Sequence, residues 1–385
     1  MKKRDIIIFF SAVLSVYALI NFYIFIRGWN AFAIIPEQRT YLLAVFTILA
    51  AAYPIGRILE RFSLSLFTEV IVYAGSIWLG LMTYLFLLTA AIDVLRLVNF
   101  IIPVFPQAVN ENFGLANFWT AIIVLAVSFI ATIGGFINAR FPQIKKLEIS
   151  VPKKNAGVNE IKIAAASDIH LGTIMRQRRL KYIVNKINSI NADVVLLPGD
   201  VFDEDIGKVI KNNLGDILKT IQSKFGIFAV TGNHEYFGGV DQAVKYLREH
   251  GINVLRDEAV SIKNTVTILG REDISYNRWS GQKRKSLNEM LKTTANDLPT
   301  IVLDHQPFNL NEPTEAGIDL QLSGHTHHGQ LWPFNFITKK VYELSWGYKK
   351  KENTHFYVSC GAGSWGPPIR TGNTPEILEI TLKLE

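Results

Sequence analysis

Four long apolar runs lie within the first 140 residues, and charged residues become frequent only after residue 140. The runs cover residues 6–26, 41–55, 70–92 and 118–137. A helix needs about 20 apolar residues to cross the hydrocarbon core of a bilayer, and only the second run falls short. The pattern predicts a transmembrane region of four helices over residues 1–140. The second run, which contains Pro54, also fits a re-entrant or buried helix.

Basic residues flank these runs unevenly, which predicts an orientation. The side with more lysine and arginine faces the cytoplasm. If all four helices cross, this rule places both termini and the C-terminal domain in the cytoplasm, whereas an odd number of crossings would place that domain outside. The residues on the more basic side are Lys2, Lys3, Arg4, Arg57, Arg61, Arg140, Lys145 and Lys146, against Arg27, Arg39 and Arg96 on the other side.

Residues 141–159 are expected to form a linker, because two prolines and the polar stretch 153–157 interrupt the pattern. From residue 160 to 385 the chain is typical of a soluble α/β domain. Predicted strands at 161–166, 193–197 and 226–230 alternate with predicted helices at 176–190, 206–222 and 240–250. Further short strands follow at 252–255, 259–262, 266–269, 300–303, 318–322, 354–359 and 377–384, with a helix at 287–294. Two sheets covered by helices account for this order.

Side chains that can bind a metal ion follow several of the predicted strands. Because the carboxyl ends of strands in an open α/β sheet form one edge, these side chains can converge. Imidazole, carboxylate and amide donors without a thiolate suit manganese, iron or zinc. The donors are too numerous for one ion, and two ions about 3.5–4 Å apart are the usual arrangement for phosphoester hydrolysis. The candidate residues are Asp168, His170, Asp200, Asn233, His234, His305, His325 and His327.

Individual roles follow from the donor types. Asp200 is the candidate bridge, because one carboxylate has two oxygens to share between two cations. Asn233 offers a neutral oxygen, which limits the negative charge around the pair. His234 can steady phosphoryl oxygens or protonate a leaving group. The candidates fall in five short motifs, which contain Asp168 and His170, Asp200, Asn233 and His234, His305, and His325 and His327. Each motif alone is weak evidence, since aspartate and asparagine are common in turns, and the prediction depends on all five occurring together.

Composition adds two limits. The chain has 40 Lys and Arg against 33 Asp and Glu, and much of the excess flanks the apolar runs, which indicates contact with a membrane rather than with nucleic acid. Cys360 is the single cysteine, so the chain forms no internal disulfide.

The series Asp168-x-His170, Gly199-Asp200-x-x-Asp203, Gly232-Asn233-His234-Glu235, His305-x-Pro307 and Gly324-His325-x-His327 resembles the calcineurin-like metallophosphoesterases. The resemblance covers residues 160–385. It implies a four-layer α/β/β/α sandwich and a dinuclear metal site. One metal would take Asp168, His170 and His327, the second Asn233, His305 and His325, and Asp200 would bridge them. His234 would be the catalytic histidine.

The ending Gly-His-Thr-His-x-Gly-Gln is similar to a membrane-attached bacterial subgroup, some of which act on lipid-linked phosphates. His328 stands where that subgroup often has glycine, which changes the expected rim of the pocket. We therefore expect a membrane-anchored, metal-dependent phosphoesterase that hydrolyses a phosphoester or pyrophosphate with a metal-activated water. Its position near the bilayer favours a lipid or lipid-linked substrate.

Two alternatives remain at this stage. One is a non-catalytic membrane sensor or scaffold that binds a phosphorylated ligand. The other is a nuclease or cyclic-nucleotide phosphodiesterase, for which the basic and aromatic stretch 276–285 is the local indication.

Overall fold

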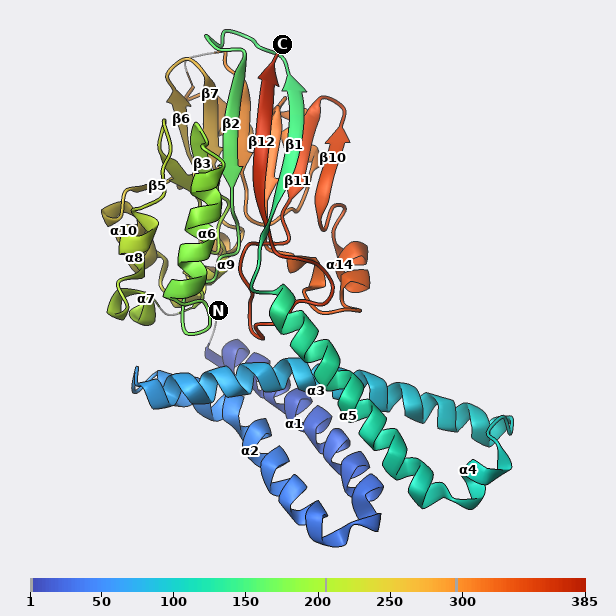
Figure 1. The fold of residues 1–385 in the computed structure, drawn as a ribbon. Coiled ribbons are helices and arrows are strands. Elements are labelled where there is room, and N and C mark those ends of the chain that lie inside the picture. Colours follow the sequence, from blue (N-terminus) through green and yellow to red (C-terminus); the bar gives the residue numbers. More distant parts are fainter. Residues whose placement is uncertain (1–2, 205, 295–296) are drawn as a thin grey trace. The chain divides into compact units, whose positions relative to one another are not determined.

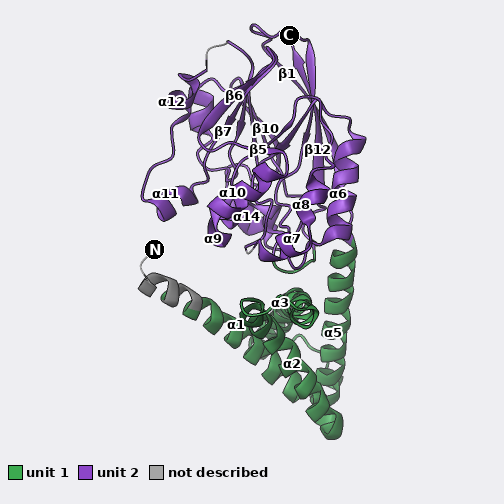
Figure 2. Cartoon of the chain, turned by 90° about the vertical axis from the view of Figure 1, so that its left-hand side faces the viewer, with its two compact units in different colours: residues 1–137, 366–369 green, residues 138–365, 370–385 purple. Residues whose placement is uncertain are grey.

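The computed structural model describes residues 3–204, 206–294 and 297–385 and divides into two compact units (Figure 1, Figure 2). The helical unit comprises Met1–Ile137 and Gly366–Ile369, and the phosphate-site unit, named here for its predicted chemistry, comprises Asn138–Trp365 and Arg370–Glu385.

The helical unit contains four helices that are long and apolar enough to cross a membrane. Its elements are α1 (Lys3–Ala31), η1 (Phe32–Ile34), α2 (Pro36–Glu60), α3 (Leu66–Ile101), α4 (Gln107–Glu111) and α5 (Phe113–Asn138). The second helix is longer than the sequence pattern predicts, because α2 continues through Pro54 and reaches 25 residues. By length, α2 is therefore a spanning candidate like the other three.

Close packing and one half-buried carboxylate hold this unit together. A Cβ atom on Gly75 would lie 2.3 Å from the backbone nitrogen of Tyr53, so only glycine lets α2 and α3 approach so closely. Asp93 on α3 lies 2.8 Å from Nη2 of Arg27 and accepts a 2.5 Å hydrogen bond from the hydroxyl of Tyr23. A carboxylate in an apolar helix is costly unless it is paired, and these contacts pair it.

Two six-stranded sheets form the centre of the phosphate-site unit. The first has the order β1 (Gln143–Val151), β12 (Glu376–Leu384), β2 (Glu160–Ala165), β3 (Val194–Leu197), β4 (Ile227–Ala229) and β5 (Ile252–Val254). The second has the order β10 (Gly347–Lys351), β11 (Thr354–Val358), β9 (Leu320–Ser323), β8 (Thr300–Leu303), β7 (Val266–Gly270) and β6 (Glu258–Ile262). Strands β2 to β5 are parallel, as are β7, β8, β9 and β11.

The hydrophobic core is divided between the layers. One cluster lies between the sheets and includes Ile163 and Leu303. A second packs α6 (Gln177–Ser189), α8 (Leu214–Leu218) and α10 (Val240–Glu249) on the outer face of the first sheet. A smaller cluster packs α12 (Leu287–Leu291) on the second sheet. The remaining helices are α7 (Gly207–Lys211), α9 (Asn233–Gly238), α11 (Ser275–Ser280), α13 (Asn311–Glu315), η2 (His327–Gly329) and α14 (Asn335–Val341). These layers are the α/β/β/α arrangement that we expected.

The structure corrects two details of the sequence-based prediction. The segment 141–159, expected to be a linker, contains β1, which pairs in parallel with β12 along its whole length. The expected helix at 206–222 is two short helices, because Asn213 has a left-handed backbone (φ 49°) that interrupts it.

Candidate metal centre

Loops at the ends of five strands bring the predicted residues together. β2 leads to Asp168 and His170, β3 to Asp200, and β4 to Asn233 and His234 at the start of α9. From the second sheet, β8 leads to His305, and β9 to His325 and His327. Since parallel strands end at one edge, residues far apart in sequence converge there.

The backbone is strained at these positions. Five of the predicted ligands adopt positive φ angles, a conformation that costs roughly 1–3 kcal/mol for a non-glycine residue and that clusters at functional sites. They are Asp168 (52°), His170 (52°), Asp200 (51°), His325 (71°) and His327 (45°).

Two glycines permit the backbone of one loop to touch a carboxylate of another. A Cβ atom on Gly324 would lie 2.1 Å from Oδ2 of Asp168, and one on Gly232 would lie 2.1 Å from Oδ1 of Asp200. No side chain larger than hydrogen fits at such distances. The glycines of the sequence motifs therefore act by close approach.

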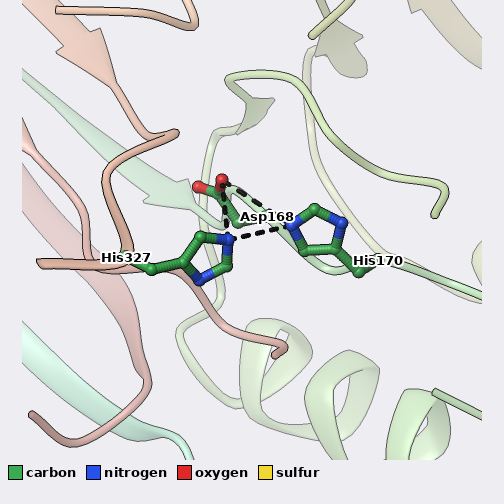
Figure 3. Close-up of side chains that lie close together, drawn as sticks. All are labelled: Asp168, His170 and His327. Carbon is green, nitrogen blue, oxygen red and sulfur yellow. Dashed lines mark hydrogen bonds and ion pairs between the residues drawn. The ribbon is translucent and has the colours of Figure 1, made fainter. Parts of the chain in front are cut away.

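The first cluster consists of Asp168, His170 and His327 (Figure 3). The Nε2 atoms of the two imidazoles face each other at 2.9 Å, and Nε2 of His327 lies 3.5 Å from Oδ1 of Asp168. Burial raises the pKa of Asp168 to about 6 and lowers that of His170 to about 3. The imidazoles are therefore neutral, as metal ligands must be.

The second cluster consists of Asp200, His305 and His325, with Asn233 beside it. Oδ1 of Asn233 lies 3.2 Å from Nε2 of His305 and 2.8 Å from Nδ1 of His325. Nδ1 of His305 donates to the carbonyl oxygen of Pro198 at 2.8 Å, which directs Nε2 at the cluster. Burial disfavours the charged form of His305, but the carboxylate of Asp200 outweighs it and raises the pKa of this imidazole. Burial lowers the pKa of His325 to about 3, so this imidazole is neutral, like those of the first cluster.

Asp200 lies between the two clusters. Its Oδ2 atom is 3.1 Å from Nε2 of His305 and 3.9 Å from Nε2 of His170. Lone pairs of imidazole, carboxylate and amide groups thus point at two neighbouring positions that share one carboxylate. This donor set fits a pair of divalent cations.

Comparison with known proteins agrees with this chemistry. A family model described as calcineurin-like phosphoesterase matches residues 161–329. An uncharacterized metallophosphoesterase of Helicobacter pylori strain J99 is 32% identical over 78% of this chain and 83% of its own length. One from Aquifex aeolicus is 34% identical over 66% of this chain and 98% of its own length. The chain belongs to the calcineurin-like metallophosphoesterases. A relative from Campylobacter jejuni, 29% identical, matches over 98% of both chains.

Relatives of this metallophosphoesterase also include a protein from Danio rerio named "transmembrane protein with metallophosphoesterase domain", 28% identical over 72% of this chain and 66% of its own length. Together with the four apolar helices, this name indicates a membrane protein.

His234, the expected catalytic histidine, borders the first cluster. Its ring centroid is 4.6 Å from that of His170, and its Nδ1 atom is 3.4 Å from Oδ1 of Asp203. Its backbone N–H donates to Oδ1 of Asp200 at 2.9 Å. Burial disfavours the charged imidazole, but the carboxylates of Asp200 and Asp203 outweigh it and raise the pKa of His234 to about 9.

Glu235 supports the backbone of the loops that form the metallophosphoesterase site, and the sequence pattern did not predict this role. Its buried carboxylate accepts the backbone N–H groups of Asp200 (3.1 Å), Phe202 (2.9 Å) and Gly232 (2.7 Å). Burial raises the pKa of Glu235 to about 7, the nearby carboxylate of Asp200 adds to this shift, and the N–H groups of Phe202 and Gly232 oppose it. Its position three residues after Gly232, where helix-capping glutamates occur, was the available signal.

Arg370 and Asn373 also support the site, and no local sequence pattern identifies them. Arg370 is fully buried, and its Nη2 atom lies 2.9 Å from Nδ1 of His327 and donates to the carbonyl oxygen of Gly363 at 2.7 Å. Asn373 donates to the carbonyl oxygen of His327 at 2.5 Å. Both hold the backbone and ring of His327 in place.

His328 joins none of the three groups of potential ligands among the described residues, the third of which is His170, Asp203 and His234. Its Nδ1 atom is 3.0 Å from the hydroxyl of Ser345, and its ring lies 5.1 Å from that of Trp346. The side chain that departs from the bacterial subgroup therefore packs beside the site.

Proposed function

We propose that this metallophosphoesterase hydrolyses a phosphoester or pyrophosphate bond in a lipid or lipid-linked substrate. The observation that carries the hydrolytic part is the pair of donor clusters joined by Asp200. The lipid part is supported by the four apolar helices of the same chain, which would hold the site near a bilayer.

The residues fit the following division of work. Asp168, His170 and His327 would hold one divalent cation, and Asn233, His305 and His325 the other, with Asp200 shared. The ions would be manganese, iron or zinc. Two such cations neutralise a phosphoryl group and lower the pKa of a water between them.

His234 has the position of a proton donor. It lies beside the first cluster, and Asp203 orients its ring. A proton held on this imidazole would reach the oxygen of the leaving group.

Activity on a substrate panel tests this proposal. Purified full-length protein, supplied in turn with manganese, iron and zinc, is offered a phospholipid, a diphosphate-linked lipid, a cyclic nucleotide and an oligonucleotide. The same panel is run with Asp200→Asn and with Asp216→Asn, which changes an exposed carboxylate on α8 as a matched control. Turnover of a lipid phosphate that is lost only in Asp200→Asn is the expected result.

Other outcomes select the alternatives. Turnover confined to cyclic nucleotides or oligonucleotides would refute the lipid assignment. Full metal occupancy without turnover of any phosphoester would instead support a sensor or scaffold that binds a phosphorylated ligand.

We also propose that both termini and the hydrolytic unit lie in the cytoplasm, because basic residues are concentrated on that side of the four spans. Lys263→Cys places a thiol in the exposed turn between β6 and β7. Labelling of this cysteine by a membrane-impermeant maleimide only after cells are permeabilised is expected. Labelling in intact cells would place the unit outside.

A further inference from the structure

An exposed apolar segment follows the metal-site loop directly. It comprises residues 332–341, and we call it the apolar rim. Four large apolar side chains in it are more than half exposed: Trp332 (55%), Phe336 (54%), Ile337 (59%) and Val341 (59%). Most of the rim is α14, and no residue of this helix is buried. Such a concentration of exposed apolar surface in ten residues marks an interaction site.

The apolar rim adjoins the second metal cluster. It begins a few residues after His327, and the residue that follows it, Tyr342, has its ring 6.2 Å from that of His325. The ring of Phe308, itself 40% exposed, lies 4.9 Å from the ring of Tyr342. A surface that covers the rim would therefore also approach the metal centre.

Apolar rings flank the other side of the centre too. Phe237 (50% exposed) and Trp365 (53% exposed) have their ring centroids 5.7 Å and 5.9 Å from that of His234. Charged or small polar substrates do not need such surroundings. Apolar side chains around a polar site fit a substrate whose phosphate projects from an apolar body.

The chain enters the phosphate-site unit at this same edge. β1 begins at Gln143, which pairs with Glu376, and β12 then runs antiparallel to β2, with Leu378 paired with Ala165. Ala165 is the last residue of β2, just before Asp168. The strand that follows the last apolar helix therefore starts where the ligand-bearing strands end.

Hydrogen bonds tie this entry point to the site. Asn138, the first residue of the unit, donates to the carbonyl oxygens of Arg370 (2.8 Å) and Asn373 (2.7 Å). These are the two residues that hold His327. If α5 crosses a membrane, its end is thus connected to the edge that carries the metal centre and the apolar rim.

The positive charge of the apolar rim favours an anionic bilayer surface as the structure that covers it. Lys339 and Lys340 lie in the last turn of α14 and are exposed. A short segment with tryptophan, phenylalanine and aliphatic side chains beside lysines is typical of helices that lie at the surface of anionic bilayers. A bilayer accounts both for these lysines and for the entry of the chain from an apolar helix at the same edge. A protein partner would need neither feature.

We propose that the apolar rim docks on the surface of the bilayer and brings the metal centre against the lipid headgroups. This inference deepens the proposed function and rests on it for the substrate, because a site held there takes a phosphorylated lipid from the membrane plane. Trp332, Phe336, Ile337 and Val341 would enter the headgroup region, and Lys339 and Lys340 would contact anionic headgroups.

Depth-dependent fluorescence quenching of the full-length protein in nanodiscs tests the docking without relying on activity. Bimane is attached to Ile337→Cys, and to Lys263→Cys as the matched control at the opposite end of the second sheet. Cys360 is buried and burial raises the pKa of its thiol, so the native cysteine reacts poorly, and the unsubstituted chain serves as the labelling blank. The discs contain phosphatidylcholine, phosphatidylglycerol and a lipid with a nitroxide near the headgroup.

The label at position 337 is expected to be quenched about twofold or more relative to the label at 263, since interfacial helices enter the bilayer by about 5–10 Å. Replacing Lys339 and Lys340 by glutamine is expected to reduce this quenching in anionic discs and not in discs of phosphatidylcholine alone. Equal quenching at both positions would overturn the docking, and would also be the result if a protein covered the rim.

Turnover of a soluble phosphoester, measured in the same discs, separates this inference from the proposed function. Turnover without quenching at position 337 refutes the docking and leaves the hydrolase assignment intact. Quenching without turnover of any phosphoester refutes the hydrolase assignment alone.

Discussion

Replacing Glu235 by glutamine isolates the support behind the bridging carboxylate. In the structure, Oε2 of Glu235 accepts the N–H groups of Asp200 and Gly232, and Oε1 accepts that of Phe202. Glutamine has nearly the same shape but only one acceptor oxygen. Its NH2 group must therefore face at least one of these backbone donors.

The expected loss of metal affinity follows from the number of hydrogen bonds that glutamine cannot accept. With the amide oxygen at the Oε1 position, the bonds to Asp200 and Gly232 are lost. With the oxygen at the Oε2 position, the bond to Phe202 is lost and the NH2 group faces that N–H group. In either orientation the loop that carries Asp200 loses at least one of its hydrogen bonds. A hydrogen bond to a charged group contributes about 1.5–3 kcal/mol when buried. Since every 1.4 kcal/mol is about tenfold in an equilibrium constant, metal binding that needs the native position of Asp200 should weaken by roughly 10- to 100-fold.

Metal titration of purified protein measures this change. Manganese binding is followed by calorimetry and by metal content after dialysis, for the native chain, Glu235→Gln and Glu249→Gln. Glu249 is an exposed glutamate at the end of α10 and is the matched control. Native affinity in Glu235→Gln would refute the claim that this carboxylate positions the bridge.

Three other changes test the site. Gly324→Ala should weaken metal binding by at least about tenfold, because its Cβ would lie 2.1 Å from Oδ2 of Asp168, whereas Gly157→Ala, with its nearest atom at 3.7 Å, should bind normally in the same titration. Arg370→Lys keeps the charge but cannot reach all the acceptors of the guanidinium group, so thermal unfolding should show a loss of about 2–4 kcal/mol, and native stability would contradict this. Removal of divalent ions with a chelator should lower the unfolding temperature, since a ligand at 100 times its Kd stabilises by about 2.7 kcal/mol. Restored manganese should reverse that change, and an unaltered unfolding temperature would argue against a metal centre.

Much of the metal centre was predictable because its signals are local. Asp168, Asp200 and His305 each follow a short apolar strand, and parallel strands place their ends together whatever the sequence between them. The glycines beside them are also local signals, because only glycine tolerates the close approach seen at Gly232 and Gly324. The structure adds the distances that show two clusters sharing Asp200.

The support behind the ligands was not predictable in the same way. Arg370 lies 43 residues after His327, and nothing in its neighbours marks it as a buried partner of that imidazole. Asn373 is likewise typical of a turn residue by sequence. Their roles arise because β12 and the loop before it pass behind the metal-site loop.

The amino-acid sequence by itself determined the four apolar helices, the alternation of strands and helices, and the identity of the donor side chains, because each depends on hydrophobic period or on residues a few positions apart. Only the tertiary structure decided that β1 pairs with β12 across more than two hundred residues, and so that the chain enters at the edge bearing the metal centre. It also decided that residues 332–341 remain exposed beside that centre. Strand pairing and side-chain exposure depend on which surfaces meet after folding. An apolar segment has the same sequence pattern whether other residues cover it or it stays exposed to solvent.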